Sequence, residues 1–288
     1  MWLLWLVTIG WAFSFSLIGE FLSGQVDNFI SVLIRTGLAL LVFLPLLRPA
    51  GVPAKTLGAL AGIGAIQIGL TYLFLFHAFD YLSVPEILLF TIFTPLYVTL
   101  VDECILGRRR LPWLWWAAAG LAVGGAAIIR YGEVSSNPWT GFFLIQCANL
   151  SFAAGQVFYK RLKLGTATSQ ARAFAFFFLG ATAISAAAAL AFADWTRIPV
   201  NTVQWSILLW LGIGASGLGY LGWNLGARMV NTGQLAVMNN MLIPTGILVN
   251  VLIWSRDADL LRLAFGGAII LVSVWLAGRS QELRPKPT

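Results

Sequence analysis

The stretch GLTYLFLFHAFDYLSVPEILLFTIFTPLYVTL, residues 69–100, is partly repeated by GLGYLGWNLGARMVNTGQLAVMNNMLIPTGILVNVL, residues 217–252. With one inserted residue, the matched positions are Gly69 with Gly217, Leu70 with Leu218, Tyr72 with Tyr220, Ala78 with Gly226, and Pro95 with Pro244. Each copy belongs to a unit with an odd number of predicted membrane spans. Duplicated odd-membered units must enter the bilayer from opposite sides, an architecture common among alternating-access carriers. The repeat therefore predicts a transporter.

Composition places the chain in a membrane. Of its 288 residues, 59% are hydrophobic and only 10% are charged, and the mean hydropathy is +0.84. A soluble domain would have too little polar material for its surface, whereas helices that face lipid need none. The formal net charge of +7 is divided among short loops instead of forming one basic stripe, so we expect membrane lipid and no nucleic acid as a partner.

About ten apolar runs reach the roughly 20 residues that a membrane-spanning helix needs. We predict an all-α integral membrane protein whose ten helices form two inverted five-helix repeats, residues 1–132 and 133–288, around a central cavity in one membrane domain. The predicted runs are 2–19, 28–47, 57–79, 85–106, 112–130, 139–159, 172–193, 203–221, 233–254 and 260–277.

The distribution of basic residues predicts the orientation. If the N-terminus is cytoplasmic, thirteen of the 18 Lys and Arg residues fall in inside segments and four in outside segments, with Arg35 inside the second run. Cytoplasmic loops carry an excess of Lys and Arg. We therefore expect both termini in the cytoplasm of a bacterial cell with this protein in its inner membrane, and we interpret Arg108–Arg110 as a topology anchor.

The residues also resemble a known family. The Trp11 region, the GxxY starts in the third and eighth runs and the Pro95/Pro244 pair resemble the drug/metabolite transporter superfamily, in particular its EamA-type ten-helix exporters. The stretch YLGWNLGARMVNTG, from Tyr220 to Gly233, is similar to a motif of bacterial aromatic amino-acid exporters, although Ile92 and Thr94 replace the aromatic residues of that group. The resemblance implies a cavity enclosed by the first, third, fourth, sixth, eighth and ninth helices. It also implies a peripheral fifth and tenth helix that could support a weak homodimer, with a monomer as the other possibility.

Polar and aromatic side chains collect on the helices that the resemblance places around the cavity. Asn149, Phe152 and Gln156 follow one helical stripe of the sixth run, and Tyr220, Trp223 and Asn224 follow one of the eighth. Polar groups in hydrocarbon are expensive unless they pair across helices or face water, so these stripes indicate either helix packing or a wet site. We predict substrate-binding roles for them and for Trp11, Ser14, Tyr72, His77, Tyr81, Glu86, Phe90 and Asn239.

The few ionisable residues within the runs each have two interpretations. Glu86, just inside the fourth run, could pair with a substrate ammonium or carry a proton, or it could simply be a helix-terminal group that reaches solvent. His77 could sense protons or hydrogen-bond to a neighbouring helix. Arg35 could meet a substrate carboxylate, but we favour a structural role in which it snorkels to the interface or pairs with Glu20 or Asp27.

Proline placement indicates where the helices bend. Pro95 and Pro244 each remove a backbone hydrogen bond in the middle of the fourth and ninth runs. Symmetric flexible points on either side of a central site suit a rocking mechanism. We predict that both prolines act as gating hinges.

Together these features predict a secondary transporter that exports amino acids or related small metabolites. The alternatives are carriage of another solute, such as an amine, a drug or a nucleotide-sugar-like metabolite, and a membrane-embedded enzyme. An enzyme is disfavoured because clustered Asp residues and a His-rich centre are missing from the sequence, and we expect no metal or cofactor. A nucleotide-binding G-x-x-x-x-G-K-[ST] loop is also missing, which argues against ATP-driven transport.

Overall fold

The structure is a computed structural model that describes residues 1–49, 51–102, 112–130, 139–254 and 260–279. Within these ranges the secondary structure is helical throughout, with no strand, so the predicted all-α class is confirmed. The predicted topology anchor Arg108–Arg110 and the predicted repeat boundary at residue 132 lie outside the described residues.

The described residues of the first half of the chain form five helical rods, and two of these rods are internally irregular. Their segments are α1 (Trp2–Phe21); α2 (Asn28–Phe43) with a terminal 3-10 turn; α3 (Ala54–Gly64), a π-helical stretch (Ala65–Leu70) and α4 (Thr71–Ala78); α5 (Val84–Phe90), a 3-10 turn (Thr91–Phe93) and α6 (Thr94–Leu100); and α7 (Trp113–Arg130).

The second half has the same kinds of irregularity at matching places. Its segments are α8 (Trp139–Arg161); α9 (Ala167–Phe192); α10 (Thr202–Leu209), a π-helical stretch (Trp210–Leu218) and α11 (Gly219–Arg228); α12 (Thr232–Met238), a 3-10 turn (Asn239–Met241) and α13 (Leu242–Trp254); and α14 (Leu260–Arg279). Each rod overlaps one of the ten predicted runs, but the eighth rod ends at Arg228, seven residues beyond its predicted run, and α9 begins five residues before its predicted run. The sequence periodicity did not reveal the π-helical stretches.

Length and composition allow many of these rods to cross a membrane. Among the described residues, eight helices are long and apolar enough to do so, and Glu86–Leu100 forms a shorter apolar helix. Large apolar side chains such as Leu190, Leu252 and Phe265 are exposed on the outside of the bundle. Exposed apolar side chains of this kind are costly in water and favourable in lipid. The protein is therefore a multi-pass membrane protein.

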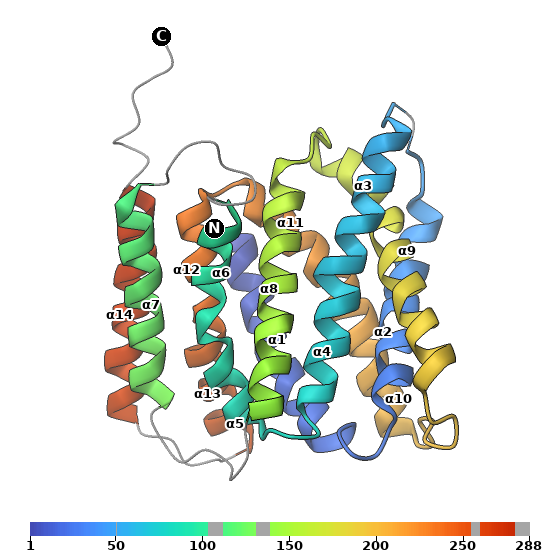
Figure 1. Ribbon diagram of the computed structural model, residues 1–288, viewed down its shortest axis with the longest axis horizontal. Coiled ribbons are helices and arrows are strands. Elements are labelled where there is room, and N and C mark those ends of the chain that lie inside the picture. Colours follow the sequence, from blue (N-terminus) through green and yellow to red (C-terminus); the bar gives the residue numbers. More distant parts are fainter. Residues whose placement is uncertain (50, 103–111, 131–138, 255–259, 280–288) are drawn as a thin grey trace.

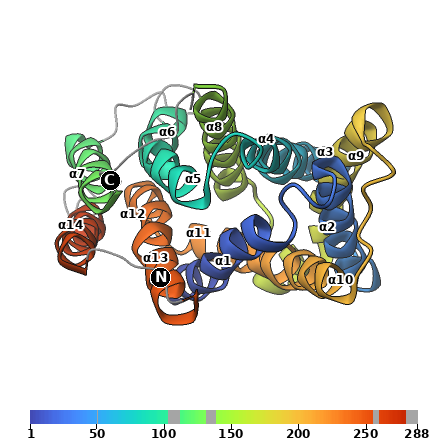
Figure 2. The same cartoon turned by 90° about the horizontal axis from the view of Figure 1, so that it is seen from below.

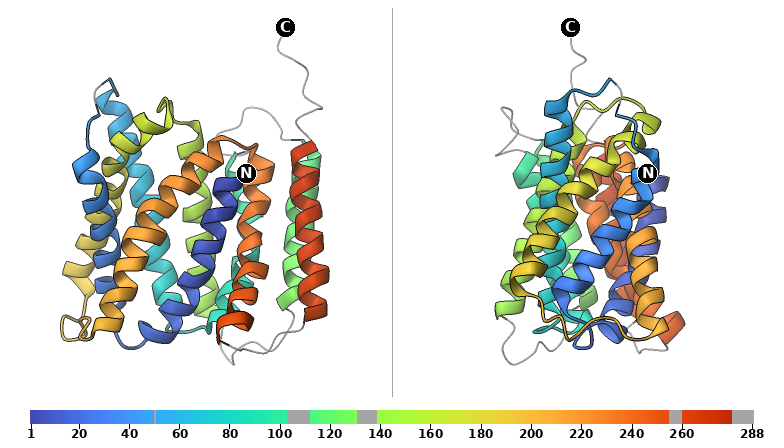
Figure 3. Two further views of the ribbon diagram at one scale, coloured as in Figure 1. Left: turned by 180° about the vertical axis from the view of Figure 1, so that it is seen from behind. Right: turned by 90° about the vertical axis from the view of Figure 1, so that its right-hand side faces the viewer.

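Two capping boxes mark helix starts at opposite faces of the bundle. Ser83 and Glu86 form one at the start of α5, where the Ser83 backbone N–H donates to the Glu86 carboxylate over 2.7 Å. Asn231 and Gln234 form the other at the start of α12. Figure 1 shows that α5 begins at the bottom of the molecule and α12 at the top, while α1 begins and α14 ends at the same upper face (Figures 1 and 3).

Packing divides the bundle into a central group and two flanks. Figure 2 shows α7 and α14 side by side at one end, α2, α3 and α9 at the other, and α1, α8 and α11 between them. Helices α3 and α9 cross at very short range, because a Cβ atom on Gly64 would lie 1.7 Å from the Phe177 carbonyl oxygen and one on Gly180 would lie 1.8 Å from that of Ala61. Only glycine at these two positions permits that crossing, which packs these two helices of the flank tightly together.

Candidate substrate-binding cavity

A cavity lies among the central helices, with about 820 Å³ of space that protein atoms leave empty, part of it open to solvent. Its wall is built from both halves of the chain: α1, α2, α4, the fourth rod, α8, α11 and the ninth rod all contribute. Eight of the predicted binding residues line it, namely Trp11, Ser14, Tyr72, Asn149, Phe152, Tyr220, Trp223 and Asn239. Their roles as substrate contacts stay predictions.

Four aromatic rings form one side of the cavity, and we call Trp11, Phe152, Tyr220 and Trp223 the aromatic cluster. The Trp11 ring is central, with centroid distances of 4.9 Å to Trp223, 5.0 Å to Tyr220 and 5.8 Å to Phe152. Its indole N–H donates to the carbonyl oxygen of Ala215 over 2.7 Å. Ala215 lies in the π-helical stretch of the eighth rod, where irregular backbone bonding leaves room for a side-chain donor. The bond fixes the ring in place.

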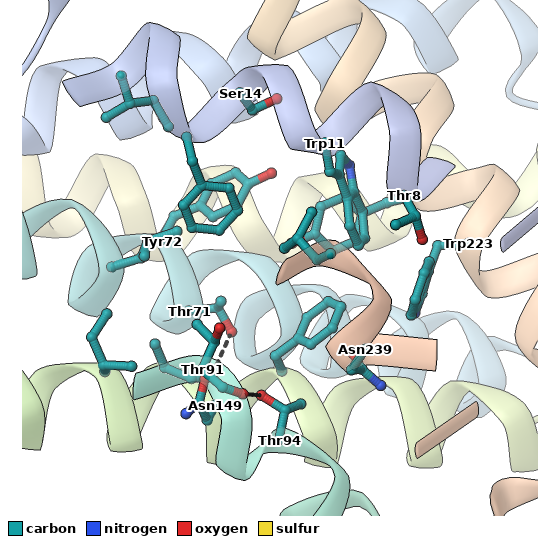
Figure 4. A pocket seen from close by; sticks show the side chains of 18 of the residues that line it. Thr8, Trp11, Ser14, Thr71, Tyr72, Thr91, Thr94, Asn149, Trp223 and Asn239 are labelled. Atoms are coloured by element: carbon teal, nitrogen blue, oxygen red, sulfur yellow. Dashed lines mark hydrogen bonds between the residues drawn. The ribbon is translucent and has the colours of Figure 1, made fainter. Parts of the chain in front are cut away.

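Hydroxyl and amide groups gather on the other side, and we call Thr71, Thr91, Thr94 and Asn149 the hydroxyl cluster. Figure 4 shows these four close together, across the cavity from Trp11 and Trp223. The Thr91 and Thr94 hydroxyls donate to the Leu88 and Thr91 carbonyls, each over 2.8 Å. The two hydroxyl protons are thus engaged in bonds within the fourth rod, and the hydroxyl oxygens can still accept hydrogen bonds from a solute.

The hydroxyl cluster sits at a break in the fourth rod. The 3-10 turn before Pro95 takes the Phe90 and Ile92 carbonyls out of the regular helical pattern. Side-chain amides from other helices bind them: Asn149 and Gln146 donate to Phe90 over 2.9 and 3.1 Å, and Asn240 donates to Ile92 over 3.0 Å. Asn149 therefore has a structural bond as well as a place in the cavity wall.

Three predicted binding residues near one face lie outside the cavity. Glu86 completes the capping box of α5 with Ser83. His77 donates from Nδ1 to the Leu73 carbonyl over 2.7 Å, and its ring centroid lies 4.4 Å from that of Phe29. Tyr81 is 51% exposed. All three lie near the end of a rod, where local capping and solvent satisfy polar groups without a ligand.

Three more predicted residues lie next to the cavity instead of in its wall. Gln156 accepts a bond from the Trp223 indole N–H over 3.0 Å, and Asn224 pairs with Gln67; each of these amides is fully buried. The Phe90 ring packs edge-on against Phe142. Each of these residues shares a helical stripe with a residue that lines the cavity. It lies one turn further along the helix or on the neighbouring face, and so does not reach the cavity wall.

The environment of Arg35 differs from the one that we favoured from the sequence. It does not pair with Glu20 or Asp27: Asp27 accepts bonds from the Ile30 and Asp194 backbone N–H groups at the start of α2. The Arg35 side chain is 3% exposed and lines the cavity. Its Nε donates to the Ser216 hydroxyl over 2.7 Å. Two turns separate Arg35 from Asp27 along α2, and the guanidinium faces the eighth rod instead of the helix end.

Comparison with known proteins agrees with this architecture. Residues 1–131 match the model of the EamA-like transporter family. Over 95% of its length the chain is 49% identical to a protein of Salmonella typhimurium, of which it covers 91%. It is 50% identical to a Pseudomonas aeruginosa protein, with 94% of each chain covered, and 47% identical to an Escherichia coli protein, with 95% of this chain and 91% of that protein covered. The chain belongs to the EamA-like transporter family.

The predicted family is thereby confirmed. The Salmonella and E. coli relatives of this EamA-like transporter are each named "Biotin transporter", and the Pseudomonas relative "Probable biotin transporter". A crystal structure that is 19% identical superposes with a TM-score of 0.77 over 98% of each chain, which shows a shared fold. The protein is therefore a transporter of a small molecule and not an enzyme.

Sequence reasoning missed several wall residues of this EamA-like transporter. Thr8, Thr71, Thr91 and Thr94 line the cavity, but threonine is common in membrane helices as an internal backbone donor and gave no distinct signal. Arg35 did give one: it is a lone ionisable residue well inside a span with no carboxylate three or four residues away in the same run. A residue of this kind is a functional-site hypothesis in a membrane protein, although we favoured a structural role for it from the sequence.

Proposed function

We propose that this EamA-like transporter carries biotin across the bacterial inner membrane through the central cavity. The observation that carries the proposal is the identity of 47–50% over nearly the whole chain to proteins of three bacteria that bear this name. Biotin has a compact fused bicycle with a thioether and a cyclic urea, and a pentanoate tail. A cavity for it needs apolar faces, hydrogen-bond acceptors for two urea N–H groups, and a partner for one carboxylate.

The two sides of the cavity support the ring part of this proposal. The aromatic cluster offers flat apolar faces that suit a rigid bicycle and a polarisable sulfur. The hydroxyl cluster offers oxygen acceptors whose own protons are already used. Urea N–H groups are donors, so they match acceptors of this kind.

An amino acid fits the described cavity less well. Our expectation of a zwitterion depended on Glu86 as the partner of an ammonium group, but that carboxylate lies in the capping box of α5. Among the described residues that line the cavity, the one charged group is a cation, Arg35. A buried ammonium without an anion would be strongly disfavoured. Biotin, a monoanion, therefore replaces amino acids as the proposed substrate.

Alternating access remains part of the proposal. The 3-10 turns Thr91–Phe93 and Asn239–Met241 lie just before Pro95 and Pro244, one in each predicted repeat. They support the hypothesis that both rods bend at these points. The start of α1 and the end of α14 lie at one face (Figure 3), which suits the proposed cytoplasmic location of both termini.

Flux measurements in liposomes test this proposal. Purified protein is reconstituted, and uptake of radiolabelled biotin is followed with and without a pH gradient, beside leucine and phenylalanine. We expect saturable biotin flux that unlabelled biotin inhibits. Tyr220→Ala in the aromatic cluster should abolish most of it, whereas the matched variant Tyr81→Ala, at an exposed position, should not. Biotin flux no greater than in empty liposomes would contradict the proposal, and amino-acid flux in its place would restore the earlier expectation.

A further inference from the structure

The cavity wall contains a buried cation from a helix that the family resemblance does not place around the site. Arg35 belongs to α2, and its guanidinium carbon lies 4.0 Å from the centroid of the Tyr72 ring. Nε donates to Ser216, whose hydroxyl is also 2.8 Å from that of Tyr72. Tyr72 and Ser216 thus hold the guanidinium plane in one orientation, one through its face and the other through its edge.

This guanidinium lacks an anion. In the part of the chain that the structure describes, no carboxylate lies within 4 Å of it, and its one hydrogen bond uses Nε. The two terminal nitrogens therefore keep their N–H donors for another partner. A charged side chain this deep in a membrane helix is costly without compensation, so residues of this kind mark substrate or ion pathways.

The local backbone is built to bring Arg35 inward. Helix α2 approaches the π-helical stretch of the eighth rod so closely that a Cβ on Gly212 would lie 3.2 Å from the Arg35 carbonyl oxygen and 2.7 Å from the Leu38 Cβ. The same stretch supplies Ser216. Ser14 lines the same cavity, and its buried hydroxyl has no hydrogen-bond partner among the described residues. An unpaired cation and an unpaired hydroxyl in one cavity both point to an absent polar group of the solute.

We propose that Arg35 binds the carboxylate of the substrate and makes the cavity selective for a singly charged organic acid. The inference rests on the proposed function, in which that carboxylate is the end of the pentanoate tail of biotin. A guanidinium presents parallel N–H donors that match the two oxygens of a carboxylate. Ser14 completes the site as a further donor, while Tyr72 and Ser216 position the guanidinium without contacting the carboxylate.

The first test uses the unaltered protein. Binding is measured in detergent through quenching of tryptophan fluorescence, since Trp11 and Trp223 line the cavity. Biotin is compared with biotinamide, which keeps the bicycle and the chain but replaces the carboxylate with a neutral amide. Hydrogen bonds to charged groups contribute enough to predict that biotinamide binds about 10- to 100-fold more weakly. Equal affinity for the two compounds would overturn the inference.

The second test asks whether Arg35 is the source of that selectivity. Arg35→Gln should weaken biotin binding about 10- to 100-fold and leave biotinamide binding nearly unchanged, so the two compounds become equivalent. Arg35→Lys should retain part of the preference, because it keeps the charge without the fork of donors. Arg48→Gln, the same change at an exposed position of α2's following segment, is the matched control and should bind biotin normally.

A purely structural role for Arg35 predicts a different result. In that case Arg35→Gln would lower the affinity for biotin and biotinamide by the same factor, and this outcome would also overturn the inference. Should Arg35→Gln fail to fold, the comparison of biotin with biotinamide on the unaltered protein still decides whether the cavity recognises the carboxylate.

The two proposals can fail separately. Biotin transport without preference over biotinamide would remove the role of Arg35 and leave the proposed function standing. Absence of biotin transport, combined with Arg35-dependent binding of another monocarboxylate such as lipoate or octanoate, would remove biotin and leave the role of Arg35 standing.

Discussion

The side-chain amides of Gln67 and Asn224 form a reciprocal pair between the two halves of the chain. Gln67 Nε2 donates to Asn224 Oδ1 over 3.0 Å, and Asn224 Nδ2 donates to Gln67 Oε1 over 3.4 Å. Each side chain is 0% exposed. Gln67 lies in the π-helical stretch of the third rod and Asn224 in α11 of the eighth, next to the aromatic cluster. The pair ties the third rod to the eighth beside the cavity.

Breaking this pair should destabilise the protein. Asn224→Leu leaves the Gln67 amide buried without a partner, and we expect a loss of about 1–3 kcal/mol in the free energy of unfolding. The measurement is thermal or SDS-induced unfolding in detergent. Gln67→Met combined with Asn224→Leu removes both polar groups and should recover part of the loss. A double variant as unstable as the sum of the two single variants would show that the amides do not act as a pair.

The position of the Trp11 ring should set substrate affinity. Trp11→Phe removes the bond to Ala215 and part of the aromatic surface against Tyr220 and Trp223. We expect the dissociation constant for biotin to rise roughly 10-fold. Isothermal titration calorimetry measures it without relying on tryptophan emission. Trp205→Phe, at an exposed site on α10, is the matched control; equal affinities in the two variants would contradict a role for Trp11.

An ion pair between the halves should hold one face of the cavity closed. Asp102, just after α6, pairs with Arg161 at the end of α8. Lys160 donates to the carbonyls of Ala227, in the last turn of α11, and Val230, just after that helix. These ends lie at the upper face in Figure 1. Asp102→Asn weakens the pair, so we expect the protein to open to that face more often.

Cysteine labelling in sealed vesicles measures this opening. Cys104 and Cys147 are first replaced with serine, and Thr94→Cys places one thiol in the cavity wall. Asp102→Asn should then accelerate labelling by an impermeant maleimide from the upper face and slow it from the other. Asp80→Asn, which removes the charge that accepts a bond from Asn28 near the opposite face, is the control and should not accelerate labelling from the upper face. Unchanged rates from both faces in Asp102→Asn would refute the closing role.

The close crossing of α3 and α9 should depend on glycine. A Cβ on Gly64 would collide with the Phe177 backbone, whereas one on Gly58 of the same helix meets nothing within 4 Å. Gly64→Ala should therefore lower stability by about 3 kcal/mol, and Gly58→Ala should be neutral or stabilising by up to about 1 kcal/mol. Thermal unfolding in detergent gives both values. Similar melting temperatures for the two variants would mean that the helices can separate without penalty.

The two prolines should affect transport more than binding. Pro95→Ala and Pro244→Ala restore a backbone donor beside the 3-10 turns of the fourth and ninth rods, which should stiffen them. We expect flux to fall several-fold while the affinity for biotin changes little. Flux and binding measured on the same preparations separate the two effects. Transport at the normal rate in both variants would exclude the hinges.

The sequence predicted the all-α membrane fold class and the family, and both are confirmed. Its ten runs each overlap a helical rod among the described residues, and four of these rods are broken internally. Eight of the fourteen predicted binding residues line the cavity. The other six lie outside the cavity wall for physical reasons that act locally or across helices. Glu86 belongs to a capping box that the adjacent Ser83 could have suggested. Asn224 is bound by Gln67, a residue 157 positions away, which no spacing within one run can reveal.

The substrate that we propose differs from the one that the sequence suggested. Polar stripes and Glu86 suggested a zwitterion, and the relatives together with the lone cation of Arg35 favour an organic acid. The difference arises because Arg35 comes from α2, outside the six helices that the resemblance places around the cavity. Its inward position depends on the close contact of α2 with the eighth rod at Gly212.

The sequence by itself determined that this is a helical membrane carrier, because the length and apolar character of each run are local properties that decide whether a segment can span lipid. Tertiary packing decided which side chains face the solute. That choice depends on how each helix is rotated about its axis and on which distant group satisfies each buried polar atom. Arg35 is an example. The sequence of the chain shows a charge within a predicted span, and only the packing of the helices shows that this charge faces the cavity.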